Sequence, residues 1–329
     1  MRALLLQSYG ETPDFKLSDI PEPQMRPGHV LVRVAAASVN PIDLKIRKLR
    51  PSFAPPLPAL LGMDMAGVVA AVGEGVTSFK PGDEVYGWPG GAGVLPGCLA
   101  QYVLADERLI ARKPGALSMA EAAALPLVTI TAWEALFDRA GVSPGQHVLI
   151  HAGAGGVGHV AVQLAKAHGA RVAATVSTPE KAALAASFGA DEVIDYRREN
   201  IETYLARLTG GVGFDMVFDT VGGANLDASL AAARPRGVVV STNTRSSHDL
   251  SPLHAKGLTL SVVFSLLPLL DGQGRERYGE ILALAAALAD AGHLRPLLSE
   301  RRFSLEEAGL AQEFLDSGKA VGKVVVDIA

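Results

Sequence analysis

The spacing of hydrophobic and polar positions changes near residue 120. Before that point, short apolar runs stand between segments that contain Pro and Gly. Runs of this kind, bounded by turn residues, are typical of strands. They cover residues 3–6, 30–35, 67–72, 84–86 and 101–104. The first part of the chain is therefore predicted to be a compact, mostly antiparallel β domain.

From about Met119 onward, apolar strands alternate with Ala-rich helical segments. The strand sequences are HVLIH, RVAAT, EVI, DMVFDT, GVVVST and LTLSVVF. Because strands separated by helices pair in parallel, the alternation predicts a doubly wound parallel sheet. A helix over 278–291 and a strand over 323–328 are expected to return to the first domain. The chain is thus predicted to be an α/β protein, with one domain formed by residues 1–122 and 267–329 and the other by residues 123–266.

A glycine pattern stands between the first of these strands and the helix that follows it. The turn contains Gly153, Gly155, Gly156, Val157 and Gly158. In a dinucleotide-binding turn, the first Gly of G-x-G-x-x-G permits the tight turn, the second lets the backbone approach a pyrophosphate, and the third lets the helix pack closely on the strand. A second strand over 171–176 follows at the expected distance. We therefore predict a dinucleotide site; the alternative is a Gly-rich turn in an ordinary α/β domain.

The residues after the second strand indicate which dinucleotide is preferred. Enzymes that prefer NAD usually carry an acidic residue here, which binds the ribose 2′-hydroxyl. This chain carries Ser177 and Thr178, which leave room for a 2′-phosphate, and Lys181 offers a positive charge one helical turn later. Glu180 opposes that charge, and Lys181 is alternatively a solvated helix residue. NADPH is the expected cofactor.

Length, charge and cysteine content limit which binding partners and which cellular compartment are expected. A length of 329 residues suggests two domains, and the net charge of −4 without a long basic run gives no electrostatic reason to expect nucleic acid or an anionic membrane as a partner. The single cysteine, Cys98, is compatible with a reducing compartment, so a cytoplasmic protein is expected. We identify no targeting segment, and the longest apolar run, residues 258–270, is too short to span a bilayer.

Six motifs follow one another along the chain: ASVNPIDLKIR, LLGMDMAGVVAAVGEGVTSFKPGDEVYG, LPLVTITAWEAL, HAGAGGVG, FDTVGG and GKAVGKVVV. Together they resemble the motifs of medium-chain dehydrogenase/reductases of the zinc-free quinone oxidoreductase branch. The resemblance covers essentially the whole chain. It implies a GroES-like catalytic domain and a Rossmann domain, reductase activity with NADPH, and a homodimer built on the last strand of the parallel sheet, near residues 258–264.

The chain departs from the zinc-dependent alcohol dehydrogenases of that family at the metal ligands. Asn40 stands where the first ligand cysteine would be, and Gly62-Met63-Asp64 replaces Gly-His-Glu. Neither a thioether nor an isolated carboxylate replaces a thiolate or an imidazole well at a zinc site, so no metal is expected. Without a Lewis acid, the favoured reaction is hydride delivery to an acceptor that is already electrophilic, a quinone or an α,β-unsaturated carbonyl.

Three polar residues of the ASVNPIDLKIR motif are the candidate catalytic groups. By resemblance, Asn40 lies at the nicotinamide and substrate cleft, and Lys45 stands where several relatives carry Tyr, so it is a candidate donor to an enolate oxygen. Asp43 is the third candidate. The alternatives are local: Asn40 as a turn residue before a proline, and Asp43 as a helix cap that pairs with Arg47.

Further cofactor contacts follow from the resemblance. Thr129 is expected to face the nicotinamide, Tyr196 to lie beside the adenosine phosphate, and Lys323 to lie near the cofactor. Their alternatives are a hydroxyl bonded to its own helix, a half-buried core tyrosine and a solvated lysine. The remaining expected contacts are Thr220, Val221 and Gly222 at a strand end, and Phe264 and Leu266, whose backbone would hold the carboxamide.

The substrate is less well defined. Phe53, Tyr86, Trp88 and the loop PGGAGVLPG are expected to shape its cleft. An enoyl thioester reductase remains an alternative and would need a basic rim such as Arg47, Lys48 and Arg50. The other alternative is a protein that binds or senses NADPH without catalysis.

Overall fold

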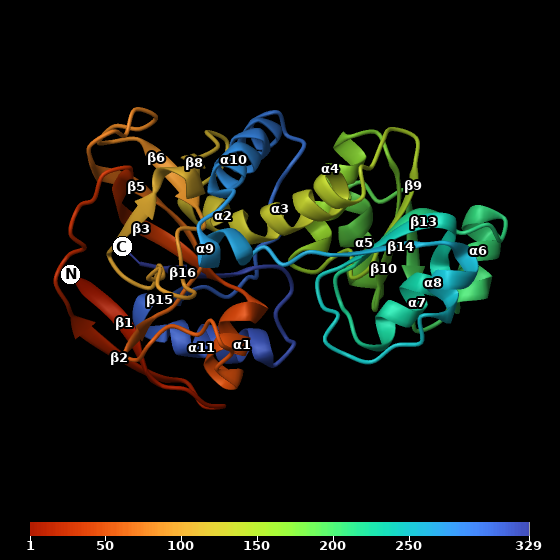
Figure 1. Ribbon diagram of the computed structural model, residues 1–329, viewed down its shortest axis with the longest axis horizontal. Helices are drawn as coiled ribbons and strands as arrows, with labels where there is room; N and C mark the ends of the chain where they lie inside the picture. Colours follow the sequence, from red (N-terminus) through yellow and green to blue (C-terminus); the bar gives the residue numbers. More distant parts are fainter. Residues whose placement is uncertain (329) are drawn as a thin grey trace. The chain divides into compact units, whose positions relative to one another are not determined.

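The chain folds into two compact units in a computed structural model that describes residues 1–328. One unit combines Met1–Leu127 with the chain from Leu266 onward, and the other is Val128–Ser265. In Figure 1 the first unit therefore contains both the red and the dark blue ends of the colour scale, and the second contains the green middle. The sequence analysis placed the boundaries after residues 122 and 266.

The first unit is built on two sheets. The larger has the order β15-β16-β3-β5-β6-β8, and β7 also pairs with β3. All of these pairs are antiparallel except β15 with β16. The strands are β3 (His29–Val39), β5 (Asp64–Val72), β6 (Glu84–Gly87), β7 (Tyr102–Asp106), β8 (Ile110–Arg112), β15 (Phe303–Ser304) and β16 (Val324–Asp327). The smaller sheet, in the order β2-β1-β4, consists of β1 (Arg2–Ser8), β2 (Asp14–Asp19) and β4 (Ala59–Leu60).

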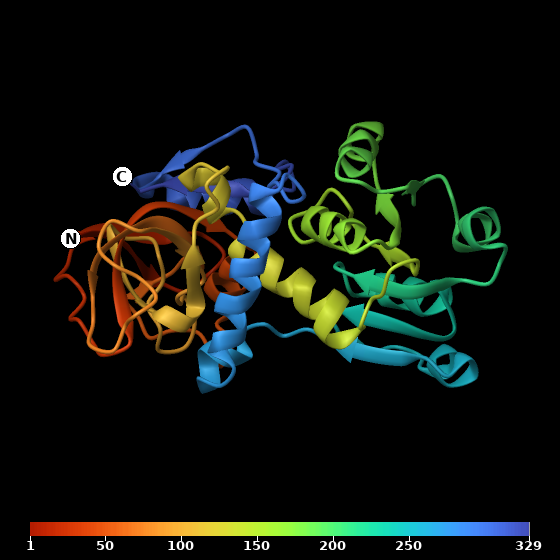
Figure 2. The same ribbon diagram turned by 90° about the horizontal axis from the view of Figure 1, so that it is seen from above.

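The first unit also contains helical segments, most of which contact strands of the two sheets. They are α1 (Pro41–Leu49), η1 (Glu107–Leu109), α2 (Met119–Ala123), α9 (Leu267–Asp271), α10 (Arg275–Asp290), η3 (Leu305–Glu307) and α11 (Ala308–Asp316). Helix α10 begins earlier than the sequence predicted and packs against β8 and η1; it is the long blue helix in Figure 2.

Two aromatic residues of β6 and its carboxyl end belong to the core beneath α10. Tyr86 is fully buried and donates a hydrogen bond from its hydroxyl to the Leu282 carbonyl at 2.6 Å. Trp88 is also buried and stacks on Tyr278, with ring centroids 6.1 Å apart. The expectation that Tyr86 and Trp88 shape a substrate cleft is therefore wrong: both fill the space between the sheet and α10.

The second unit is a six-stranded, fully parallel sheet, as predicted. Its order is β11-β10-β9-β12-β13-β14. The strands are β9 (His147–Ile150), β10 (Arg171–Val176), β11 (Glu192–Asp195), β12 (Phe214–Asp219), β13 (Ala233–Ser241) and β14 (Thr259–Val262). The chain builds outward from β9 in one direction and then from β12 in the other, so β9 and β12 flank the point where ligands bind in such sheets.

Helices connect these strands. They are α4 (Gly158–Ala167), α5 (Pro179–Ser187), α6 (Ile201–Thr209), α7 (Ala224–Ala232) and α8 (Ser251–Lys256), preceded by α3 (Pro126–Trp133) and the π-helical segment η2 (Glu134–Arg139). Part of the core consists of Leu149, Ile194, Phe214, Val217 and Val239, all fully buried. Within the described residues, no helix combines the length and the apolar character needed to cross a membrane.

Candidate cofactor and active site

The turn after β9 requires glycine at two of its positions, because a Cβ atom there would collide with neighbouring atoms. A Cβ atom at Gly158 would lie 2.0 Å from the Ala152 carbonyl oxygen, and one at Gly153 would lie 2.6 Å from the Ala174 Cβ on β10. A Cβ at Gly155 would meet only the Ala152 oxygen at 3.1 Å and the Ala152 Cβ at 3.7 Å. The turn thus packs tightly on itself and on β10, and the backbone at Gly155 is less crowded.

The tight turn is made by a different residue from the one predicted. Ala152 adopts the left-handed conformation, with a φ of 53°, whereas none of Gly153, Gly155 and Gly158 has a positive φ. Gly153 is needed because Ala174 occupies the space of its side chain. Gly158 packs against the Ala152 carbonyl within the turn, where the prediction had it pack on the strand.

The predicted adenosine contacts lie together at the carboxyl ends of β10 and β11. The backbone N–H of Tyr196 donates to the Val176 carbonyl at 3.3 Å, so Tyr196 lies beside Ser177. Tyr196 is 56% exposed, which contradicts its alternative as a half-buried core residue. Thr178 caps α5 by accepting a hydrogen bond from the Lys181 N–H at 3.3 Å. The sequence analysis did not single out Arg197, an exposed cation that follows Tyr196 directly.

Asp219 organises the loop after β12. Its buried carboxylate accepts hydrogen bonds from the Val221 and Gly222 N–H groups at 3.0 and 2.9 Å, and also from Asn225 and Ser241. Thr220 donates from its hydroxyl to the His151 carbonyl at 2.7 Å. Thr220, Val221 and Gly222 are therefore fixed next to the turn after β9, where the sheet order reverses.

Thr129 on α3 is fully buried, and its hydroxyl oxygen has no hydrogen-bond partner within the described residues. The alternative, a hydroxyl bonded to its own helix, is therefore wrong. Of the two residues expected to hold the carboxamide, Phe264 is 37% exposed and Leu266 is buried in the first unit. Ser265, between them, donates to the Glu134 carboxylate at 2.6 Å.

In the first unit, Asp64 is the centre of a buried polar cluster that consists of Ser38, Asn40, Asp43, Asp64 and Lys323. The Asp64 carboxylate accepts from the Ser38 hydroxyl and the Asn40 amide, both at 2.7 Å, from Lys323 at 3.2 Å, and from the Leu127 N–H at 2.8 Å. Lys323 also donates to the Asn40 side-chain oxygen. Because Lys323 is only 3% exposed, its alternative as a solvated charge is wrong.

Asp43 is the second carboxylate of this cluster. One of its oxygens accepts the Asn40 backbone N–H at 2.8 Å, as the capping alternative required, and the other has no hydrogen-bond partner within the described residues. Burial raises the pKa of Asp43 to about 7; the Asn40 N–H opposes that increase and the charge of Asp64 adds to it. Asp43 can therefore gain or lose a proton near neutral pH.

Arg47 does not pair with Asp43 as that alternative proposed. It is buried and donates to Gln312 at 2.8 Å and to the Gly10 and Glu11 carbonyls at 2.7 and 2.5 Å. It is consequently not available for the basic rim of a thioester site. Lys48, another member of that rim, pairs with Asp316 at 2.6 Å.

Lys45 is separated from the buried cluster. It lies on the exposed side of α1, whereas Asn40 and Asp43 are buried. Within the described residues, no hydrogen bond or ion pair joins Lys45 to either of them. The structure thus brings together Asn40, Asp43 and Lys323 and leaves Lys45 facing solvent.

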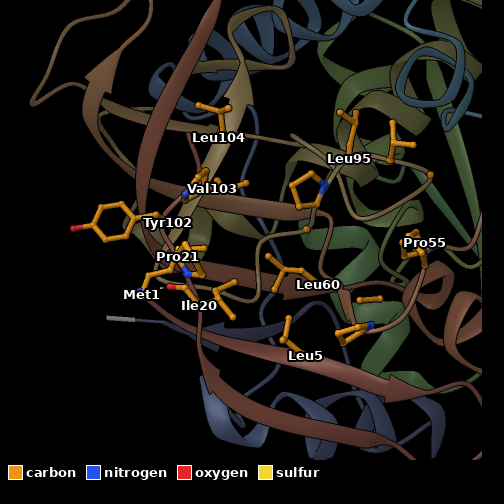
Figure 3. Close-up of a pocket in the computed structure, with 18 residues that line it drawn as sticks. Met1, Leu5, Ile20, Pro21, Pro55, Leu60, Leu95, Tyr102, Val103 and Leu104 are labelled. Atoms are coloured by element: carbon orange, nitrogen blue, oxygen red, sulfur yellow. Dashed lines mark hydrogen bonds between the residues drawn. The ribbon is translucent and has the colours of Figure 1, made fainter. Parts of the chain in front are cut away.

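The first unit also contains an apolar cavity of about 520 Å³ (Figure 3). Leu5, Ile20, Pro21, Pro55 and Leu60 are among its walls, together with the loop from Gly93 to Gly97. That volume suits a small molecule. The lining thus includes part of the loop that was expected to shape the substrate cleft, but none of the predicted catalytic or cofactor-binding residues. The described residues that line it include no carboxylate, imidazole or amine side chain for proton transfer.

The donor set does not suit a metal. Among residues 1–328, no group of three or more His, Cys, Asp or Glu side chains is placed to hold a metal ion. Met63 and Cys98 are fully buried, and the pKa of the Cys98 thiol is raised by burial and by the charges of Asp64 and Asp43.

A parallel sheet with this glycine turn, in one chain with the β-rich first unit, defines a class of dinucleotide-binding oxidoreductases. Two family descriptions match the chain: the alcohol dehydrogenase GroES-like domain over residues 26–115 and the zinc-binding dehydrogenase over residues 156–286.

Individual proteins match over the full length. A 2-methylene-furan-3-one reductase of Solanum lycopersicum is 36% identical over 99% of this chain and 79% of its own, and the human quinone oxidoreductase is 30% identical over 99% and 97%. A crystal structure of an alcohol dehydrogenase superfamily protein from Novosphingobium aromaticivorans is 45% identical over all of both chains, with a TM-score of 0.96. The chain belongs to the medium-chain dehydrogenase/reductase family, in its quinone oxidoreductase branch, which confirms the resemblance of its motifs. It is an oxidoreductase of a family that binds a nicotinamide cofactor.

Proposed function

We propose that the protein is an NADPH-dependent reductase that delivers hydride, without a metal, to a quinone or to the β-carbon of an α,β-unsaturated carbonyl. The observation that carries the proposal is the state of Asp64. This carboxylate follows the position of a zinc ligand in the alcohol dehydrogenases. It accepts from four hydrogen-bond donors, one of which is the ammonium group of Lys323. In a reaction without a metal, no Lewis acid polarises the acceptor, so the acceptor must already be electrophilic.

Two features of the second unit support a bound dinucleotide. The first is the compact glycine turn at the amino end of α4, where helix N–H groups lack intrahelical partners. The second is the buried Thr129 hydroxyl without a partner, because such a group is costly unless a ligand or water completes it. The cofactor would supply the hydride. The protein would hold the cofactor through Thr129, the glycine turn after β9 and the loop that begins at Thr220.

The preference for NADPH is supported by charge and by space. Ser177 and Thr178 are small, Lys181 follows them, and Arg197 lies next to them because Tyr196 is bonded to β10. Two hydroxyl-bearing and two cationic positions on adjacent segments suit a dianionic phosphate. Glu180 is the opposing charge on the same turn.

We assign a different role to each of the three candidate catalytic residues. Asn40 has both ends of its amide engaged, by Asp64 and by Lys323, so we assign it a positioning role. Asp43 would hold an exchangeable proton within the same cluster. Lys45 is the candidate catalytic residue, because its exposed ammonium group is free to donate to an enolate oxygen or to a water.

A homodimer is proposed from the edge of the parallel sheet. Among residues 1–328, strand β14 pairs only with β13. Val262 and Phe264, at and just after its carboxyl end, are 42% and 37% exposed. An unpaired edge with exposed apolar side chains is a surface on which a second copy can add its own strand. We also propose a cytoplasmic location, since the single Cys98 suits a reducing compartment.

The test is NADPH consumption by the purified protein with three acceptors: a simple quinone, a short enone and an enoyl thioester. We expect turnover with the quinone or the enone and little with the thioester. Preferred turnover of the thioester would replace the proposed substrate class. Tight NADPH binding without turnover of any acceptor would indicate a binding or sensing protein.

A further inference from the structure

The turn that would hold the pyrophosphate contains a strained residue. Ala152 has a φ of 53°. For a residue with a Cβ atom this conformation is unfavourable, and it persists where the surroundings enforce it. Gly would adopt it at less cost, and the chain has Gly immediately afterwards, at position 153. Other groups must therefore hold Ala152 in place.

Thr175, on the neighbouring strand β10, holds the strained residue. Its buried hydroxyl accepts the Ala152 N–H at 3.1 Å, and its backbone carbonyl accepts the Gly153 N–H at 2.9 Å. The Ala152 carbonyl is bound in turn by the Gly155 N–H at 2.8 Å. Both peptide groups that flank the strained residue are thus bound, and one of these bonds depends on a side chain.

His151 completes this arrangement. Its ring Nδ1 lies 3.2 Å from the Thr175 hydroxyl oxygen. That oxygen accepts the Ala152 N–H, which leaves the hydroxyl proton available for His151 Nδ1. We infer that the ring proton is then on Nε2, an atom that has no hydrogen-bond partner within the described residues. His151 is buried and lies on the carboxyl side of β9, where Thr220 binds its carbonyl from the other neighbouring strand at 2.7 Å.

We propose that Thr175 and His151 are positioning residues that hold the phosphate turn in its strained shape and thereby set the affinity for the pyrophosphate of a dinucleotide. The inference rests on the proposed function, because it needs a dinucleotide at this turn. It concerns neither the hydride nor the acceptor. It predicts that the hydroxyl of Thr175 acts through Ala152, at a distance from any atom of the ligand.

The test is a double-mutant cycle on NADPH affinity. Thr175→Val keeps the shape of the side chain and removes the hydroxyl, and should weaken NADPH binding about tenfold. Thr175→Ser keeps the hydroxyl and should bind as the unmodified protein does. Ala152→Gly relieves the strained φ. In that background, Thr175→Val should weaken NADPH binding by less than about threefold.

The chain offers a matched control in the same unit. The Thr209 hydroxyl also accepts a backbone N–H, from Gly213 at 3.0 Å. This bond lies just before the amino end of β12, whereas the phosphate turn follows the carboxyl end of β9. Thr209→Val should lower thermal stability to a similar extent as Thr175→Val and leave NADPH affinity unchanged. This comparison separates an effect on the turn from a general loss of stability.

Each outcome has a defined meaning. Equal affinity of Thr175→Val and the unmodified protein, or a tenfold loss that persists in the Ala152→Gly background, would overturn the inference. If Thr175→Val does not fold, the ¹⁵N spectrum of His151 in the unmodified protein decides: a proton on Nε2 is expected, and one on Nδ1 would contradict the assigned bonds. If the unmodified protein binds no dinucleotide, the proposed function itself fails.

Discussion

Replacing Asp43 with Asn is expected to change how the stability of the protein depends on pH. In the folded protein Asp43 is 1% exposed, with one carboxylate oxygen unpartnered within the described residues. Its pKa is about 7, against an ordinary value of 3.8. Asn has almost the same shape and cannot ionise, so the variant removes the titration and retains most of the packing.

The sign follows from the raised pKa. Below about pH 4 the group is protonated in both the folded and the unfolded chain, and its contribution to stability is fully present. As the pH rises towards 7, the unfolded chain ionises freely and the folded protein resists, so stability is lost. At about 1.36 kcal/mol for each pH unit between the two pKa values, the loss is about 4 kcal/mol. It is complete above about pH 8.

Urea unfolding of both proteins, from about pH 4.5 to about pH 8.5, measures this difference. The free energy of unfolding of Asp43→Asn, minus that of the unmodified protein, should rise by about 3 kcal/mol across this range, because about 1 kcal/mol of the total loss already occurs below about pH 4.5. Any pH-independent cost of the amide shifts the whole curve and leaves its slope unchanged. A flat difference would refute the assignment of a neutral-pH proton to Asp43.

Three further predictions address the cofactor, the buried cluster and the dimer. Ser177→Asp should repel a 2′-phosphate and shift the ratio of kcat/KM values from NADPH towards NADH by about tenfold or more, measured by steady-state kinetics. Asp64→Asn should lower the free energy of unfolding by about 3–5 kcal/mol because Lys323 keeps a buried charge, and adding Lys323→Met should recover part of that loss in the same urea assay. Val262→Lys, at the exposed edge of the parallel sheet, should convert a dimer to a monomer in light scattering, whereas an unchanged mass would exclude this edge as the interface.

The periodic features of the fold could be predicted from the sequence. The parallel sheet was predicted strand by strand because each strand is a continuous apolar run between Ala-rich helices. The local pattern of hydrophobic residues does not show which distant segment packs against a given side chain. Tyr86 and Trp88 are aromatic at positions that suited either a cleft or a core, and only the packing of α10 decides between them.

The site was predicted in part, for a similar reason. The sequence singled out Asn40, Asp43 and Lys323 individually, but Asn40 and Lys323 are separated by 283 positions in the chain, and their common partner Asp64 appeared only as a poor zinc ligand. Likewise, the strained conformation of Ala152 is held by the bond to Thr175, and the need for Gly at position 153 comes from the space that Ala174 occupies. Neither contact has a local signal in the sequence. Long-range contacts, and not residue types, define these features.

The most direct test of the central claim is NADPH oxidation with a quinone or an enone, measured on the same preparation before and after exhaustive dialysis against a chelator, with the bound metal quantified in parallel. We expect less than about one zinc ion per ten chains and an unchanged rate after dialysis. Stoichiometric zinc together with a rate that falls on chelation and returns when zinc is added would contradict the account of Asn40, Met63 and Asp64 given above.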